Sequence, residues 1–152
     1  MLALTPIEII FRVVPEMFLI FWAIYVFSGI SLDKKKYLKA VIIGTAGVSF
    51  IRMLPVHYGV HTIICVCLVF ILSYTICKID IMSAGKSSIM EIIMQFIAEG
   101  INIAIIEHIF KLDVNVIFNN SYLRVLYGIP SLLICVILIV IYDICKNRKK
   151  VK

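Results

Sequence analysis

The chain has 152 residues, of which 62% are hydrophobic and 16% charged, and its mean hydropathy is +1.09. A soluble domain is about 45–50% apolar and about 25% charged, so much of this chain's surface is expected to face lipid. The length leaves no room for a kinase, nuclease or ATPase domain beside the apolar segments. The net charge of +6 is interpreted as a sign of membrane topology and not of nucleic-acid binding.

Five apolar segments predict five transmembrane helices, because about 20 apolar residues cross a hydrocarbon core about 30 Å thick. Short polar loops and turns separate the segments, and a basic tail follows the last one. The sequence thus predicts an all-α, polytopic bundle that forms a single domain over residues 1–145. Its spans cover about residues 7–30, 40–55, 60–79, 89–110 and 126–144, and its tail covers residues 146–152.

The first predicted span carries charges in its outer part. Glu8, Arg12 and Glu16 recur at intervals of four residues and share a helix face. Arg12 can therefore pair within its own helix. Pro15 weakens the backbone at the same depth and is a candidate bend. A basic loop, predicted over residues 31–39, follows this span.

The second predicted span is short and rich in small residues. Ala40 and Gly44, four residues apart, indicate close helix packing within the chain or between protomers. A tight turn over residues 55–59 leads into the third span. Three polar side chains flank this turn: Arg52, His57 and His61. We expect them to lie on the outer side of the membrane, as we do Arg12.

The fourth predicted span is the most polar. Glu91, Gln95, Glu99 and Asn102 fall within about 80° of arc on a helix. A carboxylate near the bilayer centre costs about 2.5–3.5 kcal/mol on insertion scales, so this face should point inward. It either lines a polar cavity, or Glu91 lies at the cytoplasmic interface and Glu99 alone is deep and paired with an arginine. Residues 80–88 are predicted as a polar loop that ends in a serine helix cap at position 87 or 88.

The distribution of lysine and arginine predicts the orientation. Most of these residues lie on one set of span ends and few on the other, which places the C-terminus inside and, with five spans, the N-terminus outside. The residues on the cytoplasmic set of ends are Lys34, Lys35, Lys36, Lys39, Lys78, Lys86 and the basic residues of the tail.

Few residues are arranged for catalysis or for cofactor binding. Cys65 and Cys67 have no second pair at metal-ligand spacing, so neither a metal site nor a disulfide framework is expected. A phosphate loop is rejected because Asp80 stands where the first glycine would be. His61 and Cys65 are four apart and could meet, which leaves a membrane cysteine peptidase as a minor alternative. We therefore expect no enzyme activity and no cofactor.

Two stretches resemble the multi-span membrane sensor region of Firmicutes-type histidine kinases with GHKL ATPase domains, a class that includes quorum-sensing peptide receptors. They read RMLPVHYGVHT over residues 52–62 and FNNSYLRVLYGIP over residues 118–130. Such kinases continue into a phosphoacceptor helix and an ATPase domain, for which this chain has no motif. The resemblance implies a stand-alone sensor module, or a truncated relative of such kinases, in a bacterial cytoplasmic membrane. We expect it to work beside a separate kinase or as a homodimer.

The leading interpretation is thus a membrane sensor for an extracellular or membrane-borne ligand. The alternative from another class is a small transporter or substrate-capture subunit, in which the polar face of the fourth span would line a path. The residues predicted for the ligand site or polar centre are Arg12, Glu16, Arg52, His57, His61, Gln95, Glu99 and Asn102.

Overall fold

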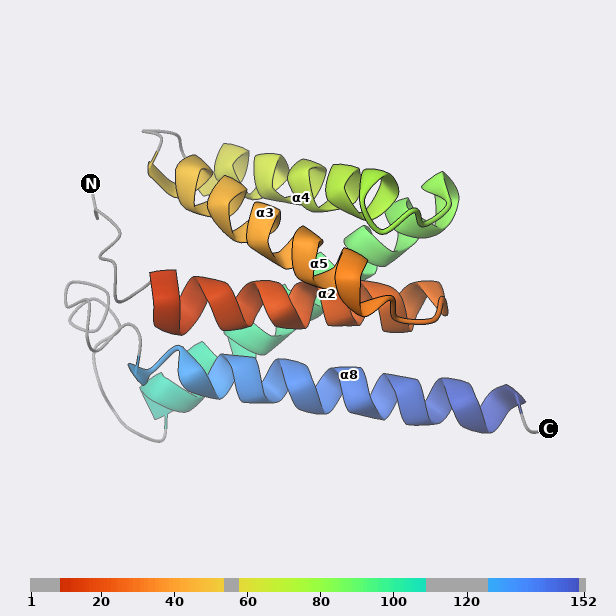
Figure 1. Cartoon of the computed structure of the whole chain (residues 1–152). Helices are drawn as coiled ribbons and strands as arrows, with labels where there is room; N and C mark the ends of the chain where they lie inside the picture. The colour runs from red at the N-terminus through yellow and green to blue at the C-terminus, as the bar shows by residue number, and fades with distance from the viewer. Residues whose placement is uncertain (1–8, 54–57, 109–125, 151–152) are drawn as a thin grey trace. The chain divides into compact units, whose positions relative to one another are not determined.

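The structure is a computed structural model that describes residues 9–53, 58–108 and 126–150. These residues are helical apart from short connections, and no strand occurs among them, so the predicted all-α fold is confirmed. The helices are the π-helical turn η1 (Ile9–Val13), α2 (Val14–Ser28), α3 (Lys34–Met53), α4 (Tyr58–Thr75), α5 (Ile81–His108) and α8 (Ile129–Lys150) (Figure 1).

The chain divides into two compact units whose boundary lies within α5. Unit 1 is Met1–Ile92 and holds η1, α2, α3, α4 and the beginning of α5; unit 2 is Ile93–Lys152 and holds the rest of α5 and α8. The single domain over residues 1–145 stays a prediction.

In unit 1, α3 contacts both α2 and α4 (Figure 1). Glycines make this possible, because a Cβ on Gly44 would lie 2.5 Å from Met17 Cε and one on Gly47 would lie 2.7 Å from Leu68 Cδ2. The close packing expected for the small-residue face is therefore found within the chain. The side chains of η1 and α2 that fill this core follow one helix face. Val13, Met17 and Phe21 are four residues apart, and Ile24 and Tyr25 follow Phe21 by three and four.

Helix α3 begins six residues before the predicted second span, at Lys34. Asp33 explains the early start, because its Oδ1 accepts the backbone N–H groups of Lys35 at 3.1 Å and Lys36 at 3.4 Å. Such a cap satisfies N–H groups that have no partner inside the helix. The predicted basic loop over residues 31–39 is therefore wrong beyond Asp33, and its lysines form the first turns of α3.

Helix α5 begins at Ile81, so the polar loop predicted over residues 80–88 is also wrong. Asp80 caps this helix through its Oδ2, which accepts the Met82 N–H at 3.2 Å. Ser87 and Ser88 lie inside the helix and are buried, so neither is the cap. An aspartate is a strong N-cap, and small residues such as those from position 83 to 88 do not prevent a helix once it has started.

The C-terminal ends of the helices also differ from the predicted spans. Helix α2 stops at Ser28, where Gly29 adopts a left-handed φ of 73° and donates its N–H to the Tyr25 carbonyl at 3.0 Å. Helix α4 stops at Thr75, before a turn with Lys78 at φ 54°. Helix α8 continues through Lys150 and includes most of the predicted tail, because basic residues suit the negative end of a helix dipole.

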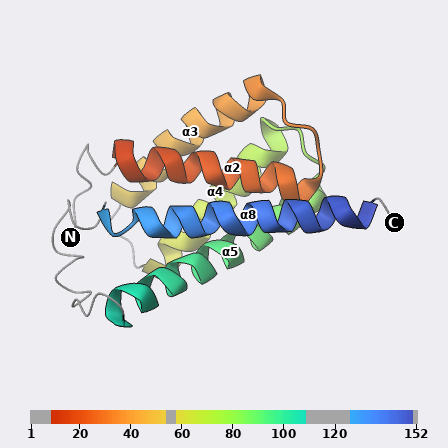
Figure 2. The ribbon, with the colours of Figure 1, turned by 90° about the horizontal axis from the view of Figure 1, so that it is seen from below.

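Three of the described helical segments are long and apolar enough to cross a membrane: Ile9–Ser28, Ile81–His108 and Ile129–Lys146. Large apolar side chains are exposed along them, as lipid-facing helices require. On α5 they include Ile89, Ile93, Phe96 and Ile97. In unit 1 the α2–α3 and α4–α5 connections lie at the same end of the helices (Figure 1 and Figure 2).

Candidate functional site

An ion pair joins α2 to α3 in the interior of unit 1. Arg52 Nη2 donates to Glu16 Oε2 at 3.1 Å and to Oε1 at 3.4 Å. The Glu16 side chain is 12% exposed and that of Arg52 is 24% exposed. Buried charges that lose a partner are strongly destabilising, so neither side chain can be removed alone without cost.

The local backbone places Glu16 at this position. The π-helical turn Ile9–Val13 ends two residues before Pro15, which lacks an N–H and whose ring clashes with the carbonyl four residues earlier in a regular helix. A wider π turn relieves that conflict, and π turns in helices are frequent at functional sites. Pro15 then lies in the first turn of α2, directly followed by Glu16.

A thiol and an imidazole on α4 adjoin the ion pair. Cys65 Sγ lies 3.7 Å from His61 Nε2, as their spacing of four residues on one helix allows. The charge of Arg52 acts on both side chains, and the charge of Glu16 acts on Cys65. Glu16, Arg52, His61 and Cys65 therefore form one group of interacting side chains, which we call the polar cluster.

Glu91 on α5 also faces this part of unit 1. Its residue is 6% exposed, and the charge of Glu16 acts on it. Because α5 begins at Ile81, Glu91 lies about three turns into the helix and not at its start. The sequence predicts Glu91 on the polar face of the fourth span but not in the site, because the predicted span begins at about residue 89, close to Glu91.

Within unit 2, one predicted site residue bonds α5 to α8 and another bonds α5 to the turn before α8. Asn102 Nδ2 donates to the Tyr127 carbonyl at 2.8 Å, and Cys135 Sγ donates to Gln95 Oε1 at 3.4 Å. Hydrogen bonds between helices in lipid contribute about 0.6 kcal/mol on average. These contacts explain the polar face of α5 in unit 2 as helix packing. Glu99 is half-buried on the same helix.

The remaining predicted residues are not placed in the polar cluster. Arg12 is half-buried in η1, where the π turn changes the spacing that the sequence predicted between Arg12 and Glu16. The Glu16 carboxylate binds Arg52 from another helix. Glu8 and His57 lie outside the described residues.

Metal binding finds no support in the described part of the chain, where no group of three or more His, Cys, Asp or Glu side chains could hold an ion. Comparison of the chain with known protein families, with curated proteins and with solved structures found no match.

Proposed function

We propose that this chain is a multi-pass sensor module of a bacterial cytoplasmic membrane, with five spans, its N-terminus outside and its C-terminus inside. Helices α3 and α4 have 20 and 18 residues, or about 30 and 27 Å, which matches a hydrocarbon core. The lysines at the start of α3 and in the α4–α5 connection support an inside location for that end of unit 1.

The observation that carries the proposal is the Glu16–Arg52 ion pair. Ionisable residues within membrane helices are rare and usually functional. Arg52 lies in the last turn of α3, at the end of unit 1 opposite the lysine-rich connections, so an external ligand could reach it. A ligand that binds Arg52 or Glu16 would compete with the ion pair and shift the packing of α2 against α3. The π turn before Pro15 provides a backbone segment able to absorb that shift.

The proposed signal runs from the ion pair in unit 1 towards the C-terminal helix α8. A change in unit 1 would be passed through α5 to α8, whose basic end lies in the cytoplasm under the proposed topology. The resemblance of residues 52–62 and 118–130 to histidine kinase sensor regions supports a separate kinase as the partner.

Co-purification from the native membrane tests this function. The tagged chain is isolated in mild detergent beside an Arg52→Gln variant and a matched Lys39→Gln variant, which removes an exposed charge from the same helix. We expect a histidine kinase or response component with the wild type and with Lys39→Gln, and an altered amount with Arg52→Gln. Recovery of a transport ATPase or another transporter subunit in place of a kinase would contradict the sensor function.

Transport is the second candidate, and the observation that favours it is the buried carboxylate of Glu91 on α5. A carrier should expose its binding residues to water from each side of the membrane in turn, whereas a sensor has no such requirement. Labelling of a Glu91→Cys variant by water-soluble reagents from both sides would favour a carrier over a sensor.

A further inference from the structure

The α4–α5 connection holds a lysine in an unusual backbone conformation. Lys78 has a φ of 54°, a region that glycine and asparagine occupy more readily than other residues. It is the one described residue other than glycine with a positive φ. A left-handed residue commonly follows the end of a helix, and here it sets the direction in which the Lys78 side chain leaves the α4–α5 connection.

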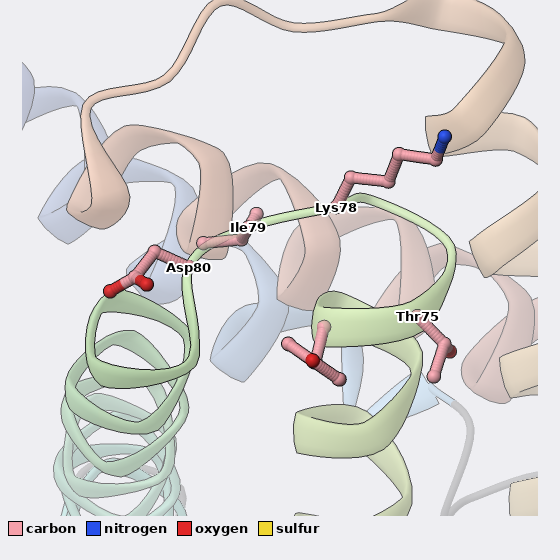
Figure 3. Close-up of a pocket in the computed structure, with 5 residues that line it drawn as sticks. Thr75, Lys78, Ile79 and Asp80 are labelled. Carbon is pink, nitrogen blue, oxygen red and sulfur yellow. The ribbon is translucent and has the colours of Figure 1, made fainter.

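Lys78 lines an open depression on the surface of unit 1. The other lining residues are Tyr74, Thr75, Ile79 and Asp80 (Figure 3). The Lys78 side chain extends away from Asp80 in Figure 3, and neither of the described ion pairs includes it. Its ammonium group is exposed and can serve a ligand. Asp80 is engaged elsewhere, because its carboxylate caps α5.

More positive charge surrounds this depression. The start of α3 lies at the same end of unit 1 as the α4–α5 connection (Figure 1 and Figure 2). Lys36 is paired with Asp33 at 3.5 Å, so the aspartate offsets its charge. The other lysines in the first turns of α3 supply the remaining positive charge at this end of unit 1. These exposed lysines are Lys34, Lys35 and Lys39.

The apolar side of the depression fits a lipid more closely than a soluble anion. Tyr74 is 51% exposed, and Ile71, one turn earlier on α4, is 52% exposed. Tyrosine favours the membrane interface, where its ring contacts the acyl chains and its hydroxyl the headgroups. An exposed lysine and an exposed tyrosine that line one depression match a phosphate and its glycerol, and the exposed Ile71 on the same helix suits an acyl chain.

We propose that the depression binds the headgroup phosphate of an anionic phospholipid of the cytoplasmic leaflet, with Lys78 as its cation and Tyr74 beside the glycerol. This inference rests on the membrane insertion and orientation of the proposed function but not on signalling. The site is distinct from the polar cluster, so either could fail without the other.

Lipid binding to the purified full chain in detergent tests the proposal, with phosphatidylglycerol and phosphatidylcholine as probes and native mass spectrometry as the readout. We expect one phosphatidylglycerol per chain and no retained phosphatidylcholine. Lys78→Gly should lower phosphatidylglycerol affinity about fivefold, the effect of one lysine near an anionic lipid surface. Glycine suits the positive φ, so this variant should fold. Lys78→Arg should keep the lipid.

Lys86→Gln is the matched control, because Lys86 is an exposed lysine on α5 outside the depression. It should retain the lipid. Equal loss in Lys78→Gly and Lys86→Gln would mean diffuse attraction and overturn the site, as would equal retention of both lipids. Displacement of the lipid by inorganic phosphate would instead assign the depression to a soluble anion. Labelling of Lys78→Cys from outside intact cells would contradict the proposed topology, whether or not the lipid binds.

Discussion

At the scale of single residues, Arg52 lies where its own helix favours a positive charge. It is in the last turn of α3, at the negative end of the helix dipole, whereas Glu16 follows the π-helical turn Ile9–Val13 within one continuous helical segment. Placement at a helix end contributes about 0.3–1 kcal/mol per charge at exposed sites and more when partly buried. The end of α3 therefore supports the ion pair in addition to the attraction between the two groups.

A double-mutant cycle measures the coupling within this pair. Glu16→Gln and Arg52→Gln should each lower the free energy of unfolding in detergent by about 3 kcal/mol, because each leaves a partly buried charge unpaired. The double variant should cost about 1–3 kcal/mol less than the sum of the single changes. Fluorescence of Trp22, the only tryptophan, follows unfolding. Strictly additive effects would show that the two side chains do not interact.

The sequence identified both members of this pair but not their pairing. The i, i+4 spacing pointed Glu16 toward Arg12, on the assumption of a regular helix. The π turn before Pro15 changes that spacing, and it arises from a steric conflict that residue patterns express only weakly. Glu91 was left out of the predicted site for a related reason, since the predicted span began at about residue 89 whereas α5 begins at Ile81.

At the scale of helices, aspartate caps decide where α3 and α5 begin. Runs of lysine and serine follow these aspartates, and such polar runs are typical of loops. Asp33 and Asp80 nevertheless cap helices that include these runs. The type of each helix and its apolar core could be predicted, because packing periodicity extends over many residues. The starts could not, because one capping side chain outweighs the polar character of the turn that follows it.

The α3 cap predicts a dependence of stability on pH. The hydrogen bond from the Lys36 backbone N–H, followed by that from Lys35, holds the pKa of the Asp33 carboxyl below its ordinary value. A carboxyl with a lower pKa in the folded state stabilises the fold above its unfolded pKa, and this contribution is lost as the pH falls through the folded pKa. The unfolding temperature should therefore fall between about pH 5 and about pH 3.

Asp33→Asn is the control for this effect, because asparagine also caps helices but does not titrate. The wild type should lose more stability than Asp33→Asn over the same pH range, as followed by Trp22 fluorescence in detergent. Parallel pH profiles for the two proteins would show that the Asp33 carboxylate makes no such contribution.

At the scale of the whole molecule, the number of spans is the property that length and composition leave open. Three described segments meet the length and hydropathy expected of a membrane helix. Helix α3 has a suitable length, but lysines and Arg52 occupy its two ends. Helix α4 has 18 residues, but its apolar stretch, Val60–Thr75, is shorter than a full span. With five spans or with three, the α2–α3 and α4–α5 connections lie on the same side of the membrane. The two arrangements differ at the C-terminal end of α3, which lies on the opposite side of the membrane with five spans and on the same side as these connections with three.

Thiol labelling at that end tests the proposed topology most directly. In a background with all five cysteines replaced, Met53→Cys introduces a thiol at the last residue of α3, where Met53 is 75% exposed. Ser31→Cys, in the exposed α2–α3 connection, is the control. If α3 crosses the membrane, an impermeant maleimide should label Met53→Cys in intact cells and Ser31→Cys only after permeabilisation. Labelling of Met53→Cys only after permeabilisation would contradict the five-span sensor, because Arg52 would then lie beyond the reach of an external ligand.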